Sequence, residues 1–230
     1  MGDCMISHEY KCIFIHIPKC AGTSIERALG HHGSFLERGV QDHRTLRQIK
    51  PKNSSNLVFY SNKLRYQRKK ILSKFGYKPN RNINNYHTVS YLQYEAYFKF
   101  SFVRNPWDRC YSWYRNVVRD PVLRDKFNTA RKSNFHDFLI ENIGKNSLRS
   151  QLFWIENSKE KIELDFIGRF EQLENDFTHV CNVIGANVSL PHILSGGRNE
   201  YRKAYSPELK DLVSEVFERE IALFGYTFDN

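Results

Sequence analysis

An apolar strand leads directly into a turn that carries a lysine and a glycine, and this order constrains the fold more than any other feature of the chain. Residues 13–24 read Ile-Phe-Ile-His-Ile-Pro-Lys-Cys-Ala-Gly-Thr-Ser, and a helical pattern follows them. The backbone N–H groups of such a turn and the helix N-terminus point toward an anion, and Lys19 adds a positive charge. The segment therefore predicts a phosphate-binding loop, although the standard P-loop pattern Gly-x-x-x-x-Gly-Lys-Ser/Thr is absent.

A second segment, residues 98–114, has the same strand–turn–helix design. Its apolar strand ends at Arg104, which would leave the strand as a fork-shaped donor for a phosphate. Asn105 suits the N-cap of the following helix, and Pro106 suits its first position. Ser112 would face the same ligand from the second turn of that helix. Two such segments predict one ligand with two separated phosphates.

The two segments resemble motifs of one enzyme family. HIPKCAGTS at 16–24 is similar to the 5′-phosphosulfate loop of the sulfotransferases that use 3′-phosphoadenosine 5′-phosphosulfate (PAPS), and FVRNPWDRCYS at 102–112 is similar to their 3′-phosphate motif. IGRFE at 167–171 and the ending FGYTF at 224–228 add to the likeness. The chain most resembles the branch that includes carbohydrate sulfotransferases and small bacterial and phage relatives.

This resemblance implies the transfer of a sulfuryl group from PAPS to an acceptor hydroxyl or amine, with adenosine 3′,5′-bisphosphate as the second product. Lys19 would stabilise the charge that builds on the bridging oxygen as the S–O bond breaks. Arg104 and Ser112 would hold the 3′-phosphate. A basic loop before the last helix would close over the nucleotide through Arg202, with Arg198 as the alternative. The remaining nucleotide contacts are expected from Ala21, Gly22, Thr23 and Ser24.

The acceptor hydroxyl also needs a base, and a histidine with a pKa near 6.5 suits this task at neutral pH. His43 falls where this family often places a histidine after the first helix, and it is the first candidate. His87, which comes shortly before the second motif, is the alternative. His16 lies inside the predicted strand, so we expect it to be structural. Gln151 is a candidate for the acceptor side of the site.

Two other functions stay open at this point. A diverged, P-loop-like nucleotide-dependent kinase would need Mg²⁺ and a carboxylate after a strand to hold the metal. A non-catalytic protein on the same scaffold would bind polyanions without any chemistry. Sulfuryl transfer itself needs no metal, because the sulfuryl group carries less charge than a phosphoryl group, and no part of the sequence is built to hold one.

The composition favours a globular protein of one domain, residues 1–230. No apolar run approaches the roughly 18 residues of a membrane-spanning helix, and the first residues lack a signal-peptide pattern, so we expect a cytoplasmic protein. The five cysteines are an odd number without zinc-ligand spacing, which favours reduced thiols. The oligomeric state is not predictable from the sequence.

Positive charge is concentrated in one part of the chain. The net charge is +10, and residues 43–94 contain twelve Lys or Arg residues but no Asp or Glu. Such a field attracts an anionic partner, for example an acidic glycan acceptor. The alternatives are a solvated lysine-rich helix and, less favoured for lack of a recognised motif, a nucleic-acid surface. The part around 52–86 is predicted to be a basic insertion relative to the family.

Apolar runs and helical periods alternate along the chain. Strands are expected at 11–17, 98–103 and 165–170, and helices at 22–29, 63–75, 87–97, 106–118, 171–184 and 206–224. Strands that alternate with helices form a parallel sheet whose faces are both covered. The predicted class is therefore α/β, with a P-loop-like parallel sheet flanked by helices on both faces. Ligands of such sheets bind at the carboxyl ends of the strands.

Overall fold

The computed structural model describes residues 5–30, 42–52, 56–75, 87–127, 129, 134–191 and 200–229. The chain divides into two compact units. Unit 1 comprises Met1–Ile17, Ala21–Phe102 and Trp154–Ile193, and unit 2 comprises Pro18–Cys20, Val103–Phe153 and Leu194–Asn230. The chain therefore passes into unit 2 for three residues of the phosphate-loop motif and then returns to unit 1. That residues 1–230 form a single domain stays a prediction.

A sheet of four strands runs in the order β1-β2-β3-β4 through the part of the chain that the structure describes. The strands are β1 (Ile6–Ser7), β2 (Cys12–Ile15), β3 (Phe98–Val103) and β4 (Phe166–Arg169). β2 and β3 are parallel, with Ile13 opposite Lys99, as the sequence predicted. β1 was not predicted, and it is antiparallel to β2. The sheet is thus mixed, because the short connection between β1 and β2 allows a hairpin but no crossover.

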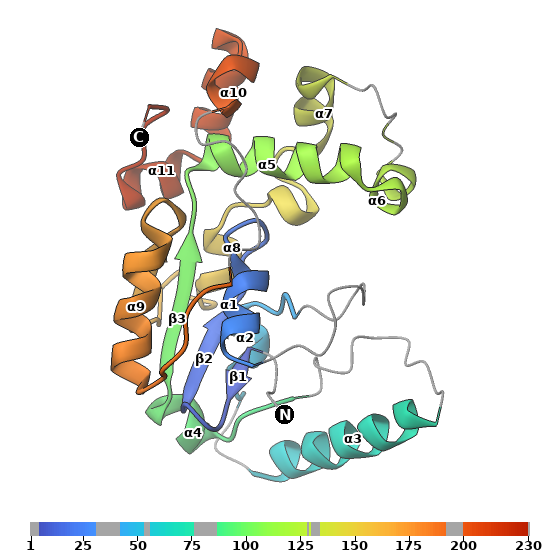
Figure 1. Ribbon diagram of the computed structural model, residues 1–230, viewed down its shortest axis with the longest axis vertical. Helices are drawn as coiled ribbons and strands as arrows, with labels where there is room; N and C mark the ends of the chain where they lie inside the picture. Colours follow the sequence, from blue (N-terminus) through green and yellow to red (C-terminus); the bar gives the residue numbers. More distant parts are fainter. Residues whose placement is uncertain are drawn as a thin grey trace. The chain divides into compact units, whose positions relative to one another are not determined.

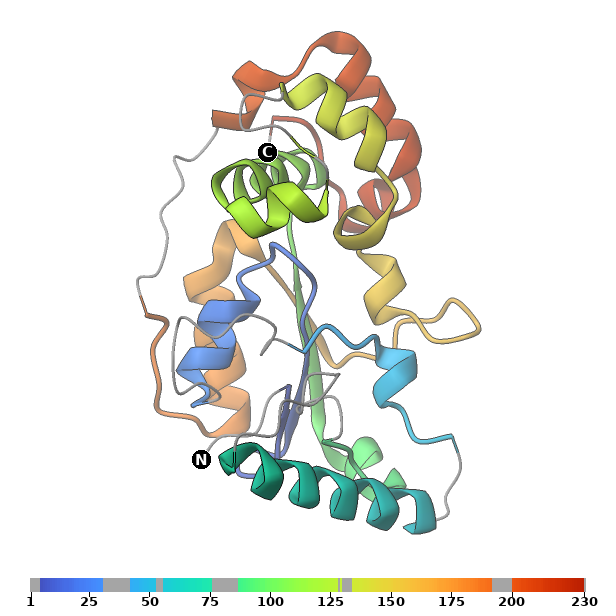
Figure 2. The same ribbon diagram turned by 90° about the vertical axis from the view of Figure 1, so that its right-hand side faces the viewer.

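Helices of unit 1 lie on both faces of this sheet, which confirms the predicted α/β class. The helices on the faces are α1 (Gly22–Ala28), α2 (Leu46–Ile49) and α9 (Leu173–Ile184), whereas α3 (Asn56–Lys74) and α4 (Tyr91–Ala96) lie beyond one end of the strands (Figures 1 and 2). Figures 1 and 2 show α1 and α9 on one face and α2 on the other. Every residue of β2 is buried as a result. The ring of Phe14 on β2 stacks on Phe100 of β3 with 5.1 Å between centroids.

One predicted helix of unit 1 begins later than expected. The helix predicted for 87–97 starts only at Tyr91, where Ser90 is the N-cap. The side chain of Ser90 accepts from the backbone N–H of Gln93, and Gln93 reaches back to the N–H of Ser90. This capping box fixes the helix start and leaves His87 in an extended segment.

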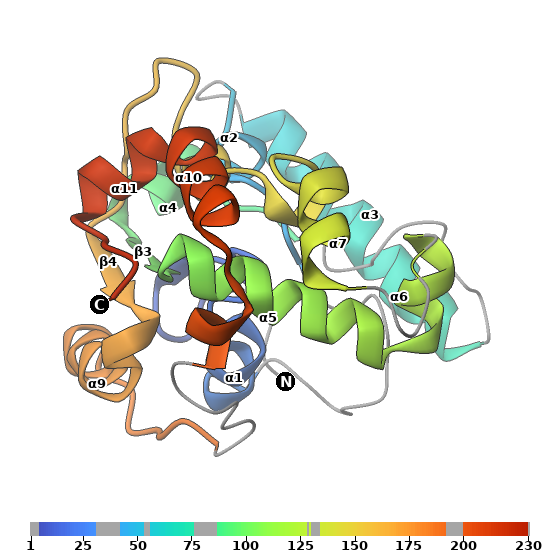
Figure 3. The ribbon, with the colours of Figure 1, turned by 90° about the horizontal axis from the view of Figure 1, so that it is seen from above.

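Unit 2 is built around the long helix α5 (Pro106–Arg119). The other elements are α6 (Pro121–Lys126), α7 (Phe135–Asn142), η2 (Asn146–Leu148), η4 (Glu200–Ala204), α10 (Pro207–Val216) and α11 (Glu218–Phe224). α5 packs against α6, α7, α10 and η4, and Figure 3 shows α7 and α10 lying over it. Two further elements are α8 (Leu152–Ile155), which runs from unit 2 into unit 1, and η3 (Phe170–Gln172), which leads into α9.

Aromatic rings form much of the core of unit 2. Tyr205 lies edge-on to Phe135 and to Phe228, and its hydroxyl donates to the carbonyl oxygen of Trp107. The helix predicted for 206–224 is two helices, because the backbone leaves helical geometry at Phe217. That side chain is buried beneath the guanidinium of Arg109. Leu209, Val213 and Phe217 are buried, but Val216 is exposed and the polar Glu220 is fully buried, so the helical period alone does not give the packing of this segment.

Replacement of Gly168 by alanine tests the packing of β4 on β3. A Cβ atom there would lie 2.4 Å from the ring of Phe102, so Gly168→Ala should lower the free energy of unfolding by about 1–3 kcal/mol. Urea unfolding measures this change. Gly185→Ala is the control, because its Cβ would meet no atom within 4 Å and only the φ of +68° is strained. An equal or smaller effect at Gly168 than at Gly185 would contradict the packing.

Candidate active site

The turn after β2 has an unusual backbone at two positions. Lys19 has a φ of 70° and Ala21 a φ of 62°, so both non-glycine residues are in the left-handed region. Side chains other than glycine, asparagine and aspartate rarely adopt this conformation, and it is found most often at functional sites. Turns with left-handed residues can point successive N–H groups toward an anion. The backbone N–H of Ser24 is already engaged, because it donates to the carbonyl oxygen of Ala21 at 2.9 Å.

Arg104 joins the ends of the two motifs within unit 2. Its Nη1 donates to the carbonyl oxygen of Lys19 at 3.0 Å and to the Oγ of Ser112 at 3.1 Å. Its Nε donates to the carboxylate of Asp108 at 2.8 Å, and Nη2 lies at the same distance from that carboxylate. The structure therefore brings together three predicted site residues, Lys19, Arg104 and Ser112, that are far apart in the sequence.

A buried glutamine fixes the backbone beneath this cluster. The Oε1 of Gln151 accepts from the N–H of Arg104 at 2.8 Å, and its Nε2 donates to the carbonyl oxygen of the same residue at 2.8 Å. The Sγ of Cys20 also donates to this Oε1 at 3.3 Å, and Gln151 Nε2 reaches the carboxylate of Glu220 at 3.1 Å. Gln151 and Glu220 are fully buried. Gln151 therefore holds the turn and the end of β3 together rather than lining an acceptor surface.

Lys19 lies in an environment that disfavours its own positive charge. Burial, together with the nearby positive charges of Arg104 and Arg119, lowers the pKa of Lys19 from 10.5 to about 8. A group whose pKa is lowered by neighbouring cations gains when an anion arrives, because the anion offsets that repulsion. This cluster of unit 2 is therefore suited to bind a negatively charged ligand.

His16, at the end of β2, organises the first turn of α1 within unit 1. Its Nδ1 lies 2.8 Å from the carboxylate of Glu26, and both side chains are buried. A Cβ atom on Gly22 would lie only 2.0 Å from the imidazole. The glycine of the motif is thus required to admit the histidine ring. His16 has the structural role that the sequence predicted, while the part played by Glu26 was missed because nothing in its local pattern marks it.

His43 packs on the other side of His16. The two rings lie 4.2 Å apart, and Nδ1 of His43 lies 3.2 Å from the carbonyl oxygen of His16. Because a carbonyl oxygen only accepts, Nδ1 carries the hydrogen and the lone pair is on Nε2. His43 is an exposed residue, yet the protein atoms around its ring and the neighbouring His16 lower its pKa from 6.5 to about 3. The imidazole is therefore neutral at physiological pH, with Nε2 able to accept a proton.

A buried ion pair holds the segment that carries His43. Asp42 is fully buried, and its carboxylate accepts from Nε and Nη2 of Arg44 at 2.6–3.0 Å. Arg44 Nη1 in turn donates to the carbonyl oxygen of His87 at 2.8 Å. Sequence reasoning did not identify Asp42 or Arg44 as positioning residues, since an Asp-His-Arg run is common on protein surfaces.

The alternative base lies elsewhere. The ring of His87 packs against His8 and Tyr66, and His8 bonds the hydroxyl of Tyr97, which directly precedes β3. Within unit 1, His87 therefore lies beyond the N-terminal ends of β2 and β3.

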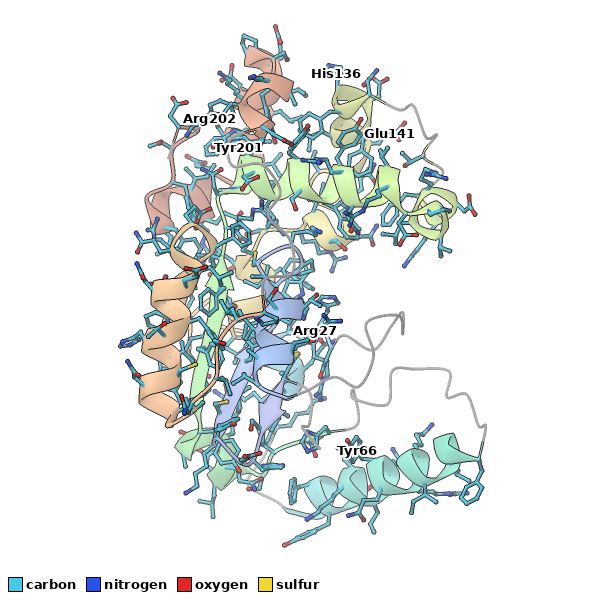
Figure 4. All side chains as sticks on the ribbon, viewed as in Figure 1. Arg27, Tyr66, His136, Glu141, Tyr201 and Arg202 are labelled. Carbon is cyan, nitrogen blue, oxygen red and sulfur yellow. The ribbon has the colours of Figure 1, made fainter. Side chains whose placement is uncertain are left out.

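Arg202, expected to close over a nucleotide, contacts the end of the chain in this structure. Its Nη2 donates to the carbonyl oxygen of Asp229 at 2.5 Å, and its guanidinium lies over the ring of Tyr201. Figure 4 shows Arg202 beside Tyr201. Arg198, the alternative, lies outside the described residues.

Other expected features concern metals, thiols and membranes. Among the described residues, no group of three His, Cys, Asp or Glu side chains is arranged to hold a metal ion. Four of the five cysteines lie in described segments, and all four are buried and free of disulfide bonds. No described helix has the length and apolar character needed to cross a bilayer.

Comparison with known proteins shows the family. The model of the Sulfotransferase family matches residues 2–227, and with this match across nearly all of its length the chain belongs to that family. It is 27% identical over 262 aligned residues to Carbohydrate sulfotransferase 14 of Danio rerio, a match that covers 98% of this chain and 62% of that protein. The chain thus spans about three fifths of the length of this relative.

Two further proteins are similar. An uncharacterized protein of Archaeoglobus fulgidus is 28% identical over 111 residues, which are 48% of this chain and 87% of that protein. The crystal structure of a sulfotransferase from Alicyclobacillus acidocaldarius aligns with a TM-score of 0.44 and 17% identity, covering 94% of this chain and 96% of the other.

The protonation state of His43 is directly measurable. In ¹⁵N-detected NMR titrations we expect its ring to stay neutral, with the hydrogen on Nδ1, as the pH falls from 8 to about 4. Since the folded pKa lies below the unfolded value, stability should decrease as the pH falls from about 6.5 toward 3. His43→Gln should remove this part of the acid sensitivity. A ring that titrates near 6.5 in the native protein would contradict the packing described above.

Proposed function

We propose that this protein transfers a sulfuryl group from PAPS to a hydroxyl group, or to an amine, of an acceptor. The observation that carries the proposal is the hydrogen bond from the Arg104 guanidinium to the Lys19 carbonyl, because it brings the two predicted phosphate motifs together at the ends of neighbouring strands. Membership in the Sulfotransferase family supports the reaction class. A nucleotide with two separate phosphate groups needs several donors, and this site offers an ammonium, a guanidinium, hydroxyl groups and the N–H groups of a left-handed turn.

Lys19 takes the central role in the proposed chemistry. During transfer the bond between sulfur and the bridging oxygen of PAPS breaks, and negative charge develops on that oxygen. The Lys19 ammonium stabilises this charge, and the turn contributes the backbone N–H groups of Ala21, Gly22 and Thr23 together with the hydroxyl groups of Thr23 and Ser24. A donor that interacts with charge present only in the transition state lowers the activation barrier and raises kcat, because it does not stabilise the bound substrate to the same extent.

His43 is the proposed base. As the new S–O bond forms, the proton of the acceptor hydroxyl moves to the lone pair on Nε2. In the free protein the low pKa makes this imidazole a weak base. A bound anion would raise that pKa toward the range in which proton transfer is efficient. Glu26, His16, Asp42 and Arg44 act as positioning residues, because they hold the ring or its backbone.

Arg104 and Ser112 are assigned to the 3′-phosphate, and Arg202 to closure over the nucleotide. Asp108 already pairs with Arg104, which orients the guanidinium and also places a negative charge beside the proposed ligand. The carboxylate of Asp108 repels an anionic ligand near Arg104. A ligand therefore binds well there only if its second phosphate interacts strongly with the guanidinium. The acceptor we propose is a carbohydrate, on the strength of the Danio rerio relative's name.

Nucleotide preference tests the proposal at its first step. By calorimetry in the presence of EDTA, the protein should bind adenosine 3′,5′-bisphosphate more tightly than ATP. Because Lys19 loses its proton above about pH 8, the affinity should fall as the pH rises through that value, whereas Lys19→Arg should show a flat profile there. Preference for ATP that depends on Mg²⁺ would instead support a kinase.

The role of Arg104 is tested by two ligands that differ in one phosphate. Arg104→Ala should lower the affinity for adenosine 3′,5′-bisphosphate by roughly tenfold to a hundredfold and lower the affinity for adenosine 5′-phosphate less, since that ligand loses only the support of the turn at Lys19. Arg115→Ala, at an exposed position on the helix α5 that follows Arg104, is the matched control and should alter the affinity for neither ligand. Equal losses for both ligands would mean that Arg104 acts only by holding the turn, and the assignment to the 3′-phosphate would be wrong.

Transfer itself is measured with ³⁵S-labelled PAPS over a panel of glycans and small alcohols. Lys19→Ala should lower kcat roughly a hundredfold to a thousandfold, with the fold intact by circular dichroism. If wild-type protein bound polyanions but transferred no label to any acceptor, and Lys19→Ala changed nothing, a non-catalytic binding protein would be the better description.

A further inference from the structure

Helix α3 exposes an apolar stripe formed by Tyr60, Leu64, Ile71 and Phe75, the last of which directly follows the helix. Their exposed fractions are 57%, 67%, 57% and 83%. At about 100° of rotation per residue, the first three lie within an arc of roughly 40°. Side chains of this kind are normally buried, and several that line up along one helix face indicate an interaction surface.

The other apolar face of α3 is already in use. The ring of Tyr66 lies 5.1 Å from the ring of His87, and Figure 4 shows Tyr66 on the side of α3 that faces the strands of unit 1. Phe59 and Lys63 line, together with Tyr66, a cavity of about 390 Å³ between α3 and the rest of the unit. Only one side of the helix is therefore available to a partner.

Basic side chains border the exposed stripe. Arg65 and Arg68 are exposed on one side of it, and Lys63 is exposed on the other. No acidic residue occurs anywhere between residues 43 and 94, so nothing in that segment offsets these charges. Exposed apolar side chains beside uncompensated cations give a surface that can contact both the anionic headgroups and the outer acyl region of a bilayer.

We propose that α3 docks this protein onto a membrane surface rich in anionic phospholipid, with the stripe inserted among the acyl chains near the headgroups. A bilayer approaches the helix from one side only, which the packed inner face requires. A protein that wraps around a basic helix would need the face that Tyr66 and Phe59 occupy. A second copy of this chain would bring two positively charged faces together.

Vesicle binding tests this docking. In flotation assays, wild-type protein should bind vesicles that mix phosphatidylcholine with phosphatidylglycerol and bind poorly to phosphatidylcholine alone. Leu64→Ser with Ile71→Ser should lower the partition coefficient by roughly tenfold or more. Arg65→Gln with Arg68→Gln should lower it by about fivefold for each charge removed, and added salt should have a similar effect.

Controls separate the stripe from general stickiness and charge. Leu223→Ser removes a similarly exposed leucine in unit 2. Lys159→Gln with Lys161→Gln removes two exposed cations elsewhere in unit 1. Neither change should alter the partition coefficient for anionic vesicles. Ile71→Trp gives a direct readout, because its fluorescence should shift to the blue on anionic vesicles and be quenched by brominated acyl chains.

The proposal would be overturned by equal binding to neutral and anionic vesicles, by unchanged binding of the stripe variants, or by a dimer in light scattering that these variants dissociate. Tighter binding of the wild type to RNA or DNA than to anionic vesicles, lost in the arginine variants alone, would also overturn it. The proposal does not depend on sulfuryl transfer, since vesicle binding is measured without nucleotide or acceptor.

Discussion

The hydrogen bond from the guanidinium of Arg104 to the carbonyl oxygen of Lys19 is the contact on which the candidate site depends. It can form only because Gln151 holds the backbone at the end of β3 and also accepts from the thiol of Cys20. One buried amide thus fixes two chain segments that carry cations. Burial, and after it the proximity of Arg104 and Arg119, lowers the pKa of Lys19 and prepares the cluster for an anion.

His16 has a comparable place in unit 1. Its ring fits against Gly22, bonds Glu26 and stacks beside His43, so one buried imidazole determines the start of α1 and the environment of the proposed base. The tautomer of His43 follows from the carbonyl oxygen of His16 rather than from any property of His43 itself. Proton acceptance at Nε2 is therefore a consequence of how the end of β2 is built.

The positively charged side chains of this protein lie in two different environments. At the strand ends a few cations are half-buried or buried, and they are held close by hydrogen bonds, which suits a small and highly charged ligand. On α3 the cations are exposed and separated by apolar side chains, which suits an extended surface with both charge and an apolar interior. The net charge of the chain does not distinguish these two kinds of binding surface. The burial of each cation and its apolar neighbours decide which kind of ligand it can bind.

Local sequence determined much of this protein. The strands around β2 and β3, the caps at Asn105 and Pro106, and the positions of Lys19 and Arg104 just after strand ends all follow from patterns within a few residues. Tertiary structure alone decided the antiparallel β1, the break at Phe217, the buried links through Gln151 and Asp42, and the partner of Arg202. Those features arise from contacts between residues distant in the chain, and a buried amide or carboxylate looks the same in a sequence as one that faces water.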